Sequence, residues 1–316
     1  MTGHAAVLRL GTRGSDLARW QAETVAQRLR ALPEAPEVEV VFIKTTGDHI
    51  THAPLHAVDG KAFFTKEIEQ ALADGRIDLA VHSLKDLATE LPPGLTVGAV
   101  LERGDPRDAL VSRDGAALTS LPTDATVATS SLRRRALIAR LRPDLKFVDV
   151  RGNVPTRLER LGSGAFDAIV LASAGLIRLG LVARITQFLP AELVLPAVSQ
   201  GAVAVEVRAG DAATRGWVER LDHAPTRSAT TAERALLREL EGGCQVPVGA
   251  LAAVDGERLS IRAIVSSLQG DRAVEGSLTG PAADAARIGR ALADDLRRRG
   301  ADEILAALRR VAVRDP

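Results

Sequence analysis

The chain has a single cysteine, Cys244, and its surroundings suit a reactive thiol. It lies in the sequence EGGCQVP at residues 241–247, where two glycines and a proline predict a loop. A cysteine on such a loop can present its sulfur to another group with little obstruction. The alternative is a small buried hydrophobic residue, a common role of free cysteine. Because its neighbours are not apolar, we interpret Cys244 as a covalent attachment point or a nucleophile.

Arginines stand at or just before predicted helix starts, where the positive end of the helix dipole disfavours cations. These arginines are Arg13, Arg133, Arg134, Arg151 and Arg157. Free backbone N–H groups, Ser or Thr hydroxyls and forked guanidinium groups together make an anion site. Ordinary surface arginine is the alternative, since only five of the 41 basic residues are lysine. The repetition favours a cleft that binds a polycarboxylate or phosphates.

A lysine and an aspartate, Lys85 and Asp86, follow a predicted strand at residues 77–83. In parallel α/β domains, sites form at the carboxyl ends of strands. There an ammonium group can bind an anion beside a catalytic carboxylate. A surface ion pair or a helix cap is the alternative for these two residues.

Three histidines, His49, His52 and His56, are close together in the sequence. We expect no metal site there, because no cysteine accompanies them and Pro54 interrupts helical spacing. Residues 47–60 predict a mobile loop that could act as a lid, with Gly60-Lys61 as its hinge.

The elements that must position these residues alternate between strand and helix. Strands are predicted at 7–10, 38–43, 77–83 and 95–101, with helices from about residue 15 and at 66–74. The first helix is expected to bury Leu17, Trp20, Thr24, Val25 and Leu29. This alternation predicts a parallel α/β domain.

A second alternating series follows a break at residues 102–107. Its strands are predicted at 126–128, 146–150 and 166–172, and its helices begin near Ser131 and Pro155. A second crossover at 189–201 precedes a strand at 202–208, which could return to the first domain. Strands at 251–254 and 259–265 and a helix at 281–299, with Ala286, Ile288, Leu292 and Leu296 on its apolar side, predict a smaller α+β domain.

The bulk composition is typical of a soluble globular protein. The 316 residues are 46% hydrophobic and 26% charged, which suits two or three domains. A net charge of +1 provides no overall field to attract nucleic acid or a membrane. We expect a cytoplasmic protein, since one cysteine fits a reducing compartment and neither a signal peptide nor a membrane span is evident.

Eight short segments, taken together, resemble the porphobilinogen deaminase family, also called hydroxymethylbilane synthase. They are GTRGS at 11–15, AVHSLKD at 80–86, DPRD at 105–108, TSSLRR at 129–134, RGNV at 151–154, AGLIRLG at 174–180, LPAVSQG at 195–201 and EGGCQVP at 241–247. Each is weak alone, but the ordered set covers nearly the whole chain and is specific.

The resemblance implies an enzyme whose Cys244 carries a dipyrromethane cofactor through a thioether. Four porphobilinogen molecules are condensed on this primer, head to tail, with loss of ammonia, and hydrolysis then frees hydroxymethylbilane. The implied fold is α/β, with two doubly wound domains like those of periplasmic binding proteins and a smaller α+β C-terminal domain. Its expected boundaries are 1–102 with 201–220, then 103–200, and then 221–316. The family resemblance also favours a monomer.

The resemblance assigns roles residue by residue, with Asp86 as the catalytic aspartate. Cofactor contacts are implied for Lys85, Thr129, Ser130, Ser131, Arg133, Arg134, Arg157 and Gly175. Substrate contacts are implied for Arg13, Ser15, Lys61, Phe64, Arg151, Arg178 and Gln200. The chain departs from the common family pattern at Ala57, Ala62, Ala88 and Ser199, where lysine, glycine, proline and glycine are frequent.

Two other functions fit parts of the sequence. A non-enzymatic binding protein of the periplasmic two-lobe type explains the doubled α/β pattern and the arginines, but it predicts an export signal and gives Cys244 no role. A ligand-sensing regulator needs a basic recognition helix, which is not evident. A covalent addition of two pyrrole units to Cys244 is expected only for the deaminase.

Overall fold

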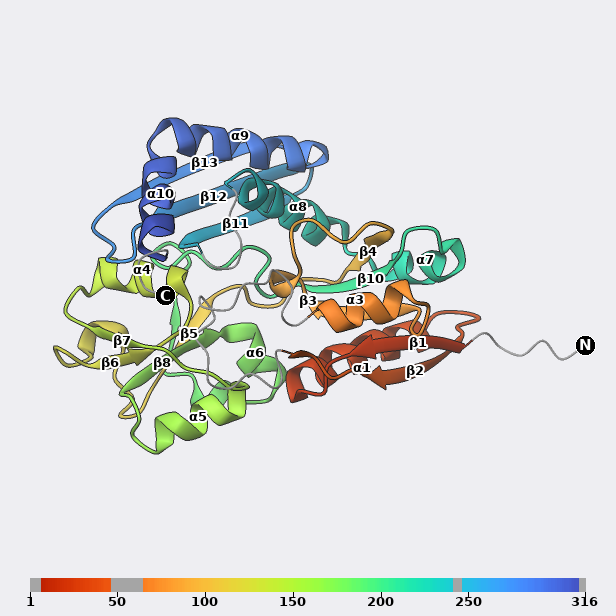
Figure 1. Ribbon diagram of the computed structural model, residues 1–316, viewed down its shortest axis with the longest axis horizontal. Coiled ribbons are helices and arrows are strands. Elements are labelled where there is room, and N and C mark those ends of the chain that lie inside the picture. Colours follow the sequence, from red (N-terminus) through yellow and green to blue (C-terminus); the bar gives the residue numbers. More distant parts are fainter. Residues whose placement is uncertain (1–6, 47–64, 241–245, 313–316) are drawn as a thin grey trace, which may run out of the picture. The chain divides into compact units, whose positions relative to one another are not determined.

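The computed structural model describes residues 7–46, 65–240 and 246–312, with side chains described through residue 308. Strands in this part of the chain form two five-stranded sheets and one three-stranded sheet (Figure 1). The described residues divide into two compact units. One takes its residues from Met1–Ile50, Gly60–Arg103 and Ala202–Arg227, and the other from Thr51–Asp59, Gly104–Gly201 and Ser228–Pro316.

The first sheet has the strand order β2-β1-β3-β10-β4. Its strands are β1 (Val7–Thr12), β2 (Glu37–Phe42), β3 (Leu79–Ser83), β4 (Leu95–Val100) and β10 (Val203–Arg208). Strand β1 is parallel to β2 and β3, whereas β10 is antiparallel to both β3 and β4. The prediction that the strand near residue 202 returns to the first domain is confirmed. The four strands predicted before residue 102 run in one direction, as expected for a parallel α/β domain, because β3 and β4 are both antiparallel to β10. Only β10 runs against them, and hydrophobic patterning carries no information on its direction.

Two helices cover opposite faces of this sheet. Helix α1 (Asp16–Arg30) packs with Leu79 and Val81, while α3 (Lys66–Ala73) packs with Ala80. Successive strand residues point to opposite faces, so the alternation along β3 places the helices on the two sides. The same unit contains α7 (Ala212–Val218) and the 3₁₀ turns η2 (Leu84–Asp86) and η5 (Glu219–Leu221).

Helix α1 begins at the N-cap Ser15 and buries a different stripe from the predicted one. Val25 and Leu29 are buried as expected, but Trp20 is 39% exposed. Gln21, Ala22 and Ala26 complete the buried stripe. The prediction chose larger side chains at helical spacing, whereas the small Ala22 and Ala26 can lie against the sheet and Trp20 is left at the margin.

The second sheet has the order β7-β6-β8-β5-β9. Its strands are β5 (Asp108–Ser112), β6 (Thr126–Ala128), β7 (Lys146–Val148), β8 (Ala168–Ala172) and β9 (Gln187–Leu189). Strand β6 is parallel to β7 and β8, and β5 is antiparallel to β8 and β9. The order and relative directions of the strands match those of the first sheet. The two five-stranded sheets with their helices, called lobes below, therefore have the same arrangement. Strands β5 and β9 were not predicted, because each is short and borders a segment interpreted as a crossover.

Helices also cover both faces of the second sheet. Helix α4 (Leu132–Leu141) packs with Leu110 and Val170, whereas α5 (Val154–Gly162) and α6 (Ser173–Arg178) pack with Ala109 and Ile169. The 3₁₀ turns η3 (Leu118–Ser120) and η4 (Val182–Arg184) lie in its connections. Each lobe is therefore doubly wound.

The third sheet is an antiparallel meander of β11 (Val248–Asp255), β12 (Arg258–Ser266) and β13 (Ala273–Pro281). Helices α8 (Ala224–Glu239), α9 (Ala285–Arg298) and α10 (Ala301–Ala312) contribute to one core with it, and η6 (Ala282–Asp284) precedes α9. Helix α9 buries Ile288, Leu292 and Leu296 as predicted, but Ala285 and Gly289 in place of Ala286.

The predicted fold class is confirmed: an α/β protein with two doubly wound lobes and a smaller α+β part at the C-terminal end. The three domain boundaries stay a prediction. No described helix has the length and apolar character needed to cross a membrane.

Candidate active site

The predicted catalytic turn follows the end of β3. Strand β3 ends at Ser83, and η2 then carries Lys85, which is half-buried, and Asp86, which is exposed. Arg13 follows the end of β1, which is the parallel neighbour of β3. Arg13 and the Lys85–Asp86 turn therefore lie at the same carboxyl edge of the first sheet. The strand-end rule predicted this position for Lys85 and Asp86, but not for Arg13. Ser15 is nearby in sequence and caps α1, accepting a bond from Ala18 N at 3.4 Å.

Backbone bonds and buried leucines hold this turn in place. Leu84 donates its N–H to Ala202 O at 3.0 Å, and Leu87 donates to Leu84 O at 3.3 Å. Leu84 and Leu87 are buried in a small apolar cluster. The turn thus presents an exposed carboxylate from a fixed backbone, which is what electrostatic catalysis requires.

The second sheet gathers another group of predicted residues at its carboxyl edge. Strands β6, β7 and β8 are parallel to one another. Residues 129–134 follow β6, Arg151 follows β7, and α6, which contains Gly175 and Arg178, follows β8. The three hydroxyls shape the loop before α4. Thr129 Oγ1 accepts from Ser131 N at 3.2 Å, Ser130 Oγ donates to Val150 O at 2.9 Å, and Ser131 caps α4.

Arg133 and Arg134 are buried and share an internal carboxylate, Asp108, at the start of β5. Arg133 Nη1 lies 2.8 Å from one carboxylate oxygen, and Arg134 Nη2 lies 2.8 Å from the other. Gln200 Nε2 donates to Asp108 at 2.9 Å. These arginines were predicted to hold the cofactor; the structure gives them a protein partner that the sequence analysis did not assign. Two guanidinium groups and one carboxylate retain one net positive charge, so an anionic ligand is still favoured there.

Burial alone would raise the pKa of Asp108, but Arg133 and Arg134 hold that pKa well below its usual range. Burial lowers the pKa of Arg133, and the charge of Asp108 opposes this effect. The charges of Asp108 and Arg133 therefore favour each other's ionised form in the interior.

Replacing Asp108 with Asn should lower the free energy of unfolding by about 3–5 kcal/mol, because two buried guanidinium groups lose their counter-ion. A carboxyl with a lowered native pKa contributes stability above its unfolded pKa of about 3.9, and this stability is lost as the pH falls. The difference between wild type and Asp108→Asn should therefore shrink in acid. Urea unfolding at pH 7 and at about pH 2, between the unfolded pKa and the lowered native pKa, measures both effects. Asp144→Asn, which breaks the partly exposed pair with Arg142, is the control and should change little. Equal stability of Asp108→Asn and wild type at pH 7 would contradict the role of Asp108.

The remaining predicted cations of this edge are half-buried. Arg157 Nε donates to Gly152 O at 2.7 Å, and Arg178 Nη2 donates to Gly201 O at 2.6 Å. Burial lowers the pKa of Arg178 to about 10 and also lowers the pKa of Arg151, which the charge of Asp149 opposes. Carboxylate groups of a ligand would offset this cost of burial. The donor set therefore fits a dipyrromethane that bears acetate and propionate groups.

Gln200 lies between two residues with positive φ. Ser199 has φ 63° and Gly201 has φ 88°. A Cβ on Gly201 would lie 2.7 Å from Gly104 O, so glycine is required there. Ser199 occupies the left-handed region that favours glycine, which explains why glycine is frequent in the family at this position. Its N–H is held by Glu233 Oε2 at 2.6 Å, a contact that no sequence signal indicated.

Several predicted residues lie outside the described residues. These are Lys61, Phe64 and Cys244, the three clustered histidines, and Ala57 and Ala62. The roles assigned to them stay predictions.

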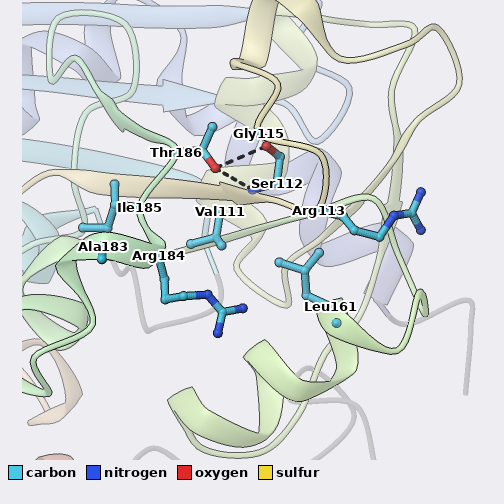
Figure 2. A pocket seen from close by; sticks show the side chains of 10 residues that line it. Val111, Ser112, Arg113, Gly115, Leu161, Ala183, Arg184, Ile185 and Thr186 are labelled. Atoms are coloured by element: carbon cyan, nitrogen blue, oxygen red, sulfur yellow. Dashed lines mark hydrogen bonds between the residues drawn. The ribbon is translucent and has the colours of Figure 1, made fainter.

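A cavity of about 460 Å³ lies at the opposite edge of the second sheet (Figure 2). Val111, Leu161, Arg184 and Thr186 are among its lining residues, and none of the predicted site residues lines it. Strand β5 runs from Asp108, at the carboxyl edge, to Ser112, whose N–H donates to Thr186 Oγ1 at 3.0 Å beside this cavity. The cavity is therefore separate from the candidate active site.

Known proteins resemble nearly the whole chain. Residues 8–216 match the family model "Porphobilinogen deaminase, dipyromethane cofactor binding domain", and residues 228–298 match "Porphobilinogen deaminase, C-terminal domain". The porphobilinogen deaminase of Geobacter sulfurreducens is 47% identical over 299 residues, covering 95% of this chain and 94% of the relative. That of Desulforudis audaxviator is 51% identical over 302 residues, covering 95% and 97%.

Among solved structures, the methionine binding protein MetQ is 13% identical, with a TM-score of 0.45, over 68% of this chain and 89% of that one. This likeness is too remote to support an argument. The two family models and the relatives near 50% identity together show that the chain belongs to the porphobilinogen deaminase family.

Proposed function

We propose that this protein joins four porphobilinogen molecules head to tail on a dipyrromethane primer attached to Cys244. Ammonia leaves at each addition, and hydrolysis releases hydroxymethylbilane. The observation that best supports this reaction is the exposed carboxylate of Asp86, carried by a fixed turn at the carboxyl edge of the first sheet.

Asp86 suits the difficult part of the reaction. The aminomethyl group of porphobilinogen is already an ammonium at neutral pH, so its C–N bond can break with loss of ammonia and little acid assistance. The remaining cation is delocalised over the pyrrole ring, and a carboxylate beside the ring N–H stabilises it. When the new C–C bond forms, the same carboxylate can take part in removing the proton from the ring carbon.

The cations of the two carboxyl edges suit binding and orientation of the substrate. Arg13 and Lys85 belong to the first edge, and Arg151, Arg157 and Arg178 belong to the second. Their guanidinium and ammonium groups would bind the acetate and propionate groups and fix each ring for reaction. The dipyrromethane, when bound, supplies the pyrrole carbon from which the chain grows.

We also propose that the protein acts in the cytoplasm as a monomer, with porphobilinogen as its substrate and no nucleic-acid or membrane partner. The near-neutral net charge of +1 and the single cysteine support this assignment.

Intact-protein mass spectrometry tests the proposed function. Protein isolated from cells that make porphobilinogen should be heavier than its sequence by two pyrrole units, and proteolysis should place this addition on the peptide that contains Cys244. The rival function, a binding protein without chemistry, predicts the unmodified mass. An unmodified mass in protein that has been incubated with porphobilinogen would contradict the proposal.

A further inference from the structure

Three titratable side chains that the proposed reaction does not use are buried together in the first unit. His82 of β3, Glu206 of β10 and Glu69 of α3 are 6%, 0% and 6% exposed. His82 Nε2 lies 3.1 Å from Glu206 Oε2. His82 pairs in register with Ala204, and Glu206 pairs with Ala80, so the two charged residues are diagonal neighbours on one face of the sheet. This is the face that packs against α3.

The charges of this cluster do not balance if both carboxyl groups are ionised. One imidazole stands beside two carboxyl groups, and Oε1 of Glu206 and Oε1 of Glu69 are buried without a hydrogen-bond partner among the described residues. Burial raises the pKa of Glu69, the Thr65 hydroxyl opposes this rise, the charge of Glu206 adds to it, and His82 opposes it. Of these groups, Glu69 is therefore the one whose surroundings favour the protonated form.

The His82–Glu206 bond lies at the end of β3 that leads into the catalytic turn. His82 and Ser83 are the last two residues of the strand, and their side chains form hydrogen bonds on opposite faces of the sheet. Ser83 Oγ accepts from Gln21 Nε2 of α1 at 2.8 Å, opposite the Glu206 contact. The turn that carries Asp86 begins with the next residue.

A second ion pair joins the same two strands at their other end, and it provides a natural comparison. Arg208 Nη2 at the end of β10 lies 3.1 Å from Asp78 Oδ1, just before β3 begins. Arg208 also donates to the carbonyls of Leu72 and Ile77. Both contacts stabilise the β3–β10 pair, but only the His82–Glu206 contact adjoins the catalytic turn.

We propose that His82 and Glu206 are positioning residues for the Lys85–Asp86 turn. The inference rests on the proposed catalytic role of Asp86. The hydrogen bond between His82 and Glu206 holds the end of β3 in place, and the turn with Asp86 begins two residues later. The position of the strand end therefore sets the distance from the Asp86 carboxylate to the reacting ring. Displacement by about 1 Å at a reacting centre can cost about a hundredfold in rate.

A graded series at Glu206 tests this proposal. Glu206→Met, which removes the acceptor and keeps much of the volume, should lower kcat roughly ten- to a hundredfold. KM should change less than kcat, since Lys85 is the one proposed substrate-binding cation that lies on this turn. Glu206→Gln keeps an oxygen that accepts from His82, so it should restore most of kcat. Arg208→Met is the matched control: it should lower the unfolding temperature at least as much as Glu206→Met while leaving kcat within about twofold of wild type. Assays well below each unfolding temperature separate rate from stability.

Three outcomes would overturn the proposal. One is a wild-type kcat in Glu206→Met, and another is an equal loss of kcat in Arg208→Met, which would indicate general destabilisation. If Glu206→Met does not fold, the double variant His82→Phe with Glu206→Met decides, because it removes the bond and leaves no buried group of the pair without its partner. It should lower kcat as expected for Glu206→Met, and a wild-type kcat in it is the third. Asp86→Asn, measured in parallel, separates the two proposals. A fast Asp86→Asn protein removes the catalytic role of Asp86 on which this inference rests, whereas a slow Asp86→Asn with a fast Glu206→Met removes only the positioning role.

The raised pKa of Glu69 has its own readout. A carboxyl with a raised native pKa contributes stability below its unfolded pKa of about 4.3, and this contribution is lost as the pH rises through the native pKa. Glu69→Gln resembles the protonated acid and should lose less thermal stability than wild type between pH 5 and pH 9. Parallel curves for the two proteins would remove Glu69 from the cluster.

Discussion

Replacing Cys244 with Ser should abolish the covalent primer and with it nearly all turnover of porphobilinogen. An alcohol is a much weaker nucleophile than a thiolate, so the hydroxyl of serine captures an electrophilic pyrrole carbon far less readily. The remaining site residues are unchanged, and the protein should fold normally, because the substitution changes only one atom in a glycine-flanked segment.

The single cysteine makes this experiment easy to interpret. A thiol reagent reads the state of Cys244 alone: wild-type protein that carries the primer should have no reactive thiol, and protein made without porphobilinogen should have one. Intact mass and an acid stain for pyrroles complete the measurement. A Cys244→Ser protein that carries the full addition of two pyrrole units would show that attachment lies elsewhere.

Replacing Asp86 with Asn should slow condensation by about 10²–10³-fold, because one preorganised charge beside the developing cation is lost. The amide keeps the shape and most hydrogen bonding of the carboxylate. The loss should therefore fall on the chemical step and not on capture of substrate, for which we propose the arginine and lysine side chains.

Single-turnover condensation on Asp86→Asn protein that already carries the primer isolates this step. Asp74→Asn is a suitable control, since Asp74 is an exposed carboxylate of the same unit that follows α3, ahead of the amino end of β3. Its rate should equal that of wild type. If Asp86→Asn also condenses porphobilinogen at the wild-type rate, Asp86 has only a structural role at the end of the strand.

Local features of the site could be predicted because they depend on residues close in sequence. A hydroxyl residue before an apolar-periodic run predicts a helix start, and Ser131 is the N-cap of α4. The strand at residues 126–128 has the predicted bounds. The position of Asp86 follows from the general rule that parallel strands end at one edge.

Other features could not be predicted, because they depend on pairing between distant segments. Arg133 and Arg134 meet Asp108 only because β5 enters the sheet antiparallel to β8, which places its first residue at the carboxyl edge. The sequence indicates neither the direction of β5 nor its place in the sheet. The His82–Glu206 bond likewise joins residues 124 positions apart, through the register of β3 and β10.

The position of β10 inside the first sheet has a consequence for how the chain folds during synthesis. Strand β4 is joined to the sheet through β10, whose residues 203–208 are made more than 100 positions after β4 begins. At about 5–20 residues per second, a ribosome needs roughly 5–20 seconds to supply them. Throughout that interval β3 has one unpaired edge, with the apolar sequence LAV, and β4 has no partner in the sheet. The nascent first lobe is therefore open to aggregation and to chaperone binding until most of the second lobe has left the ribosome.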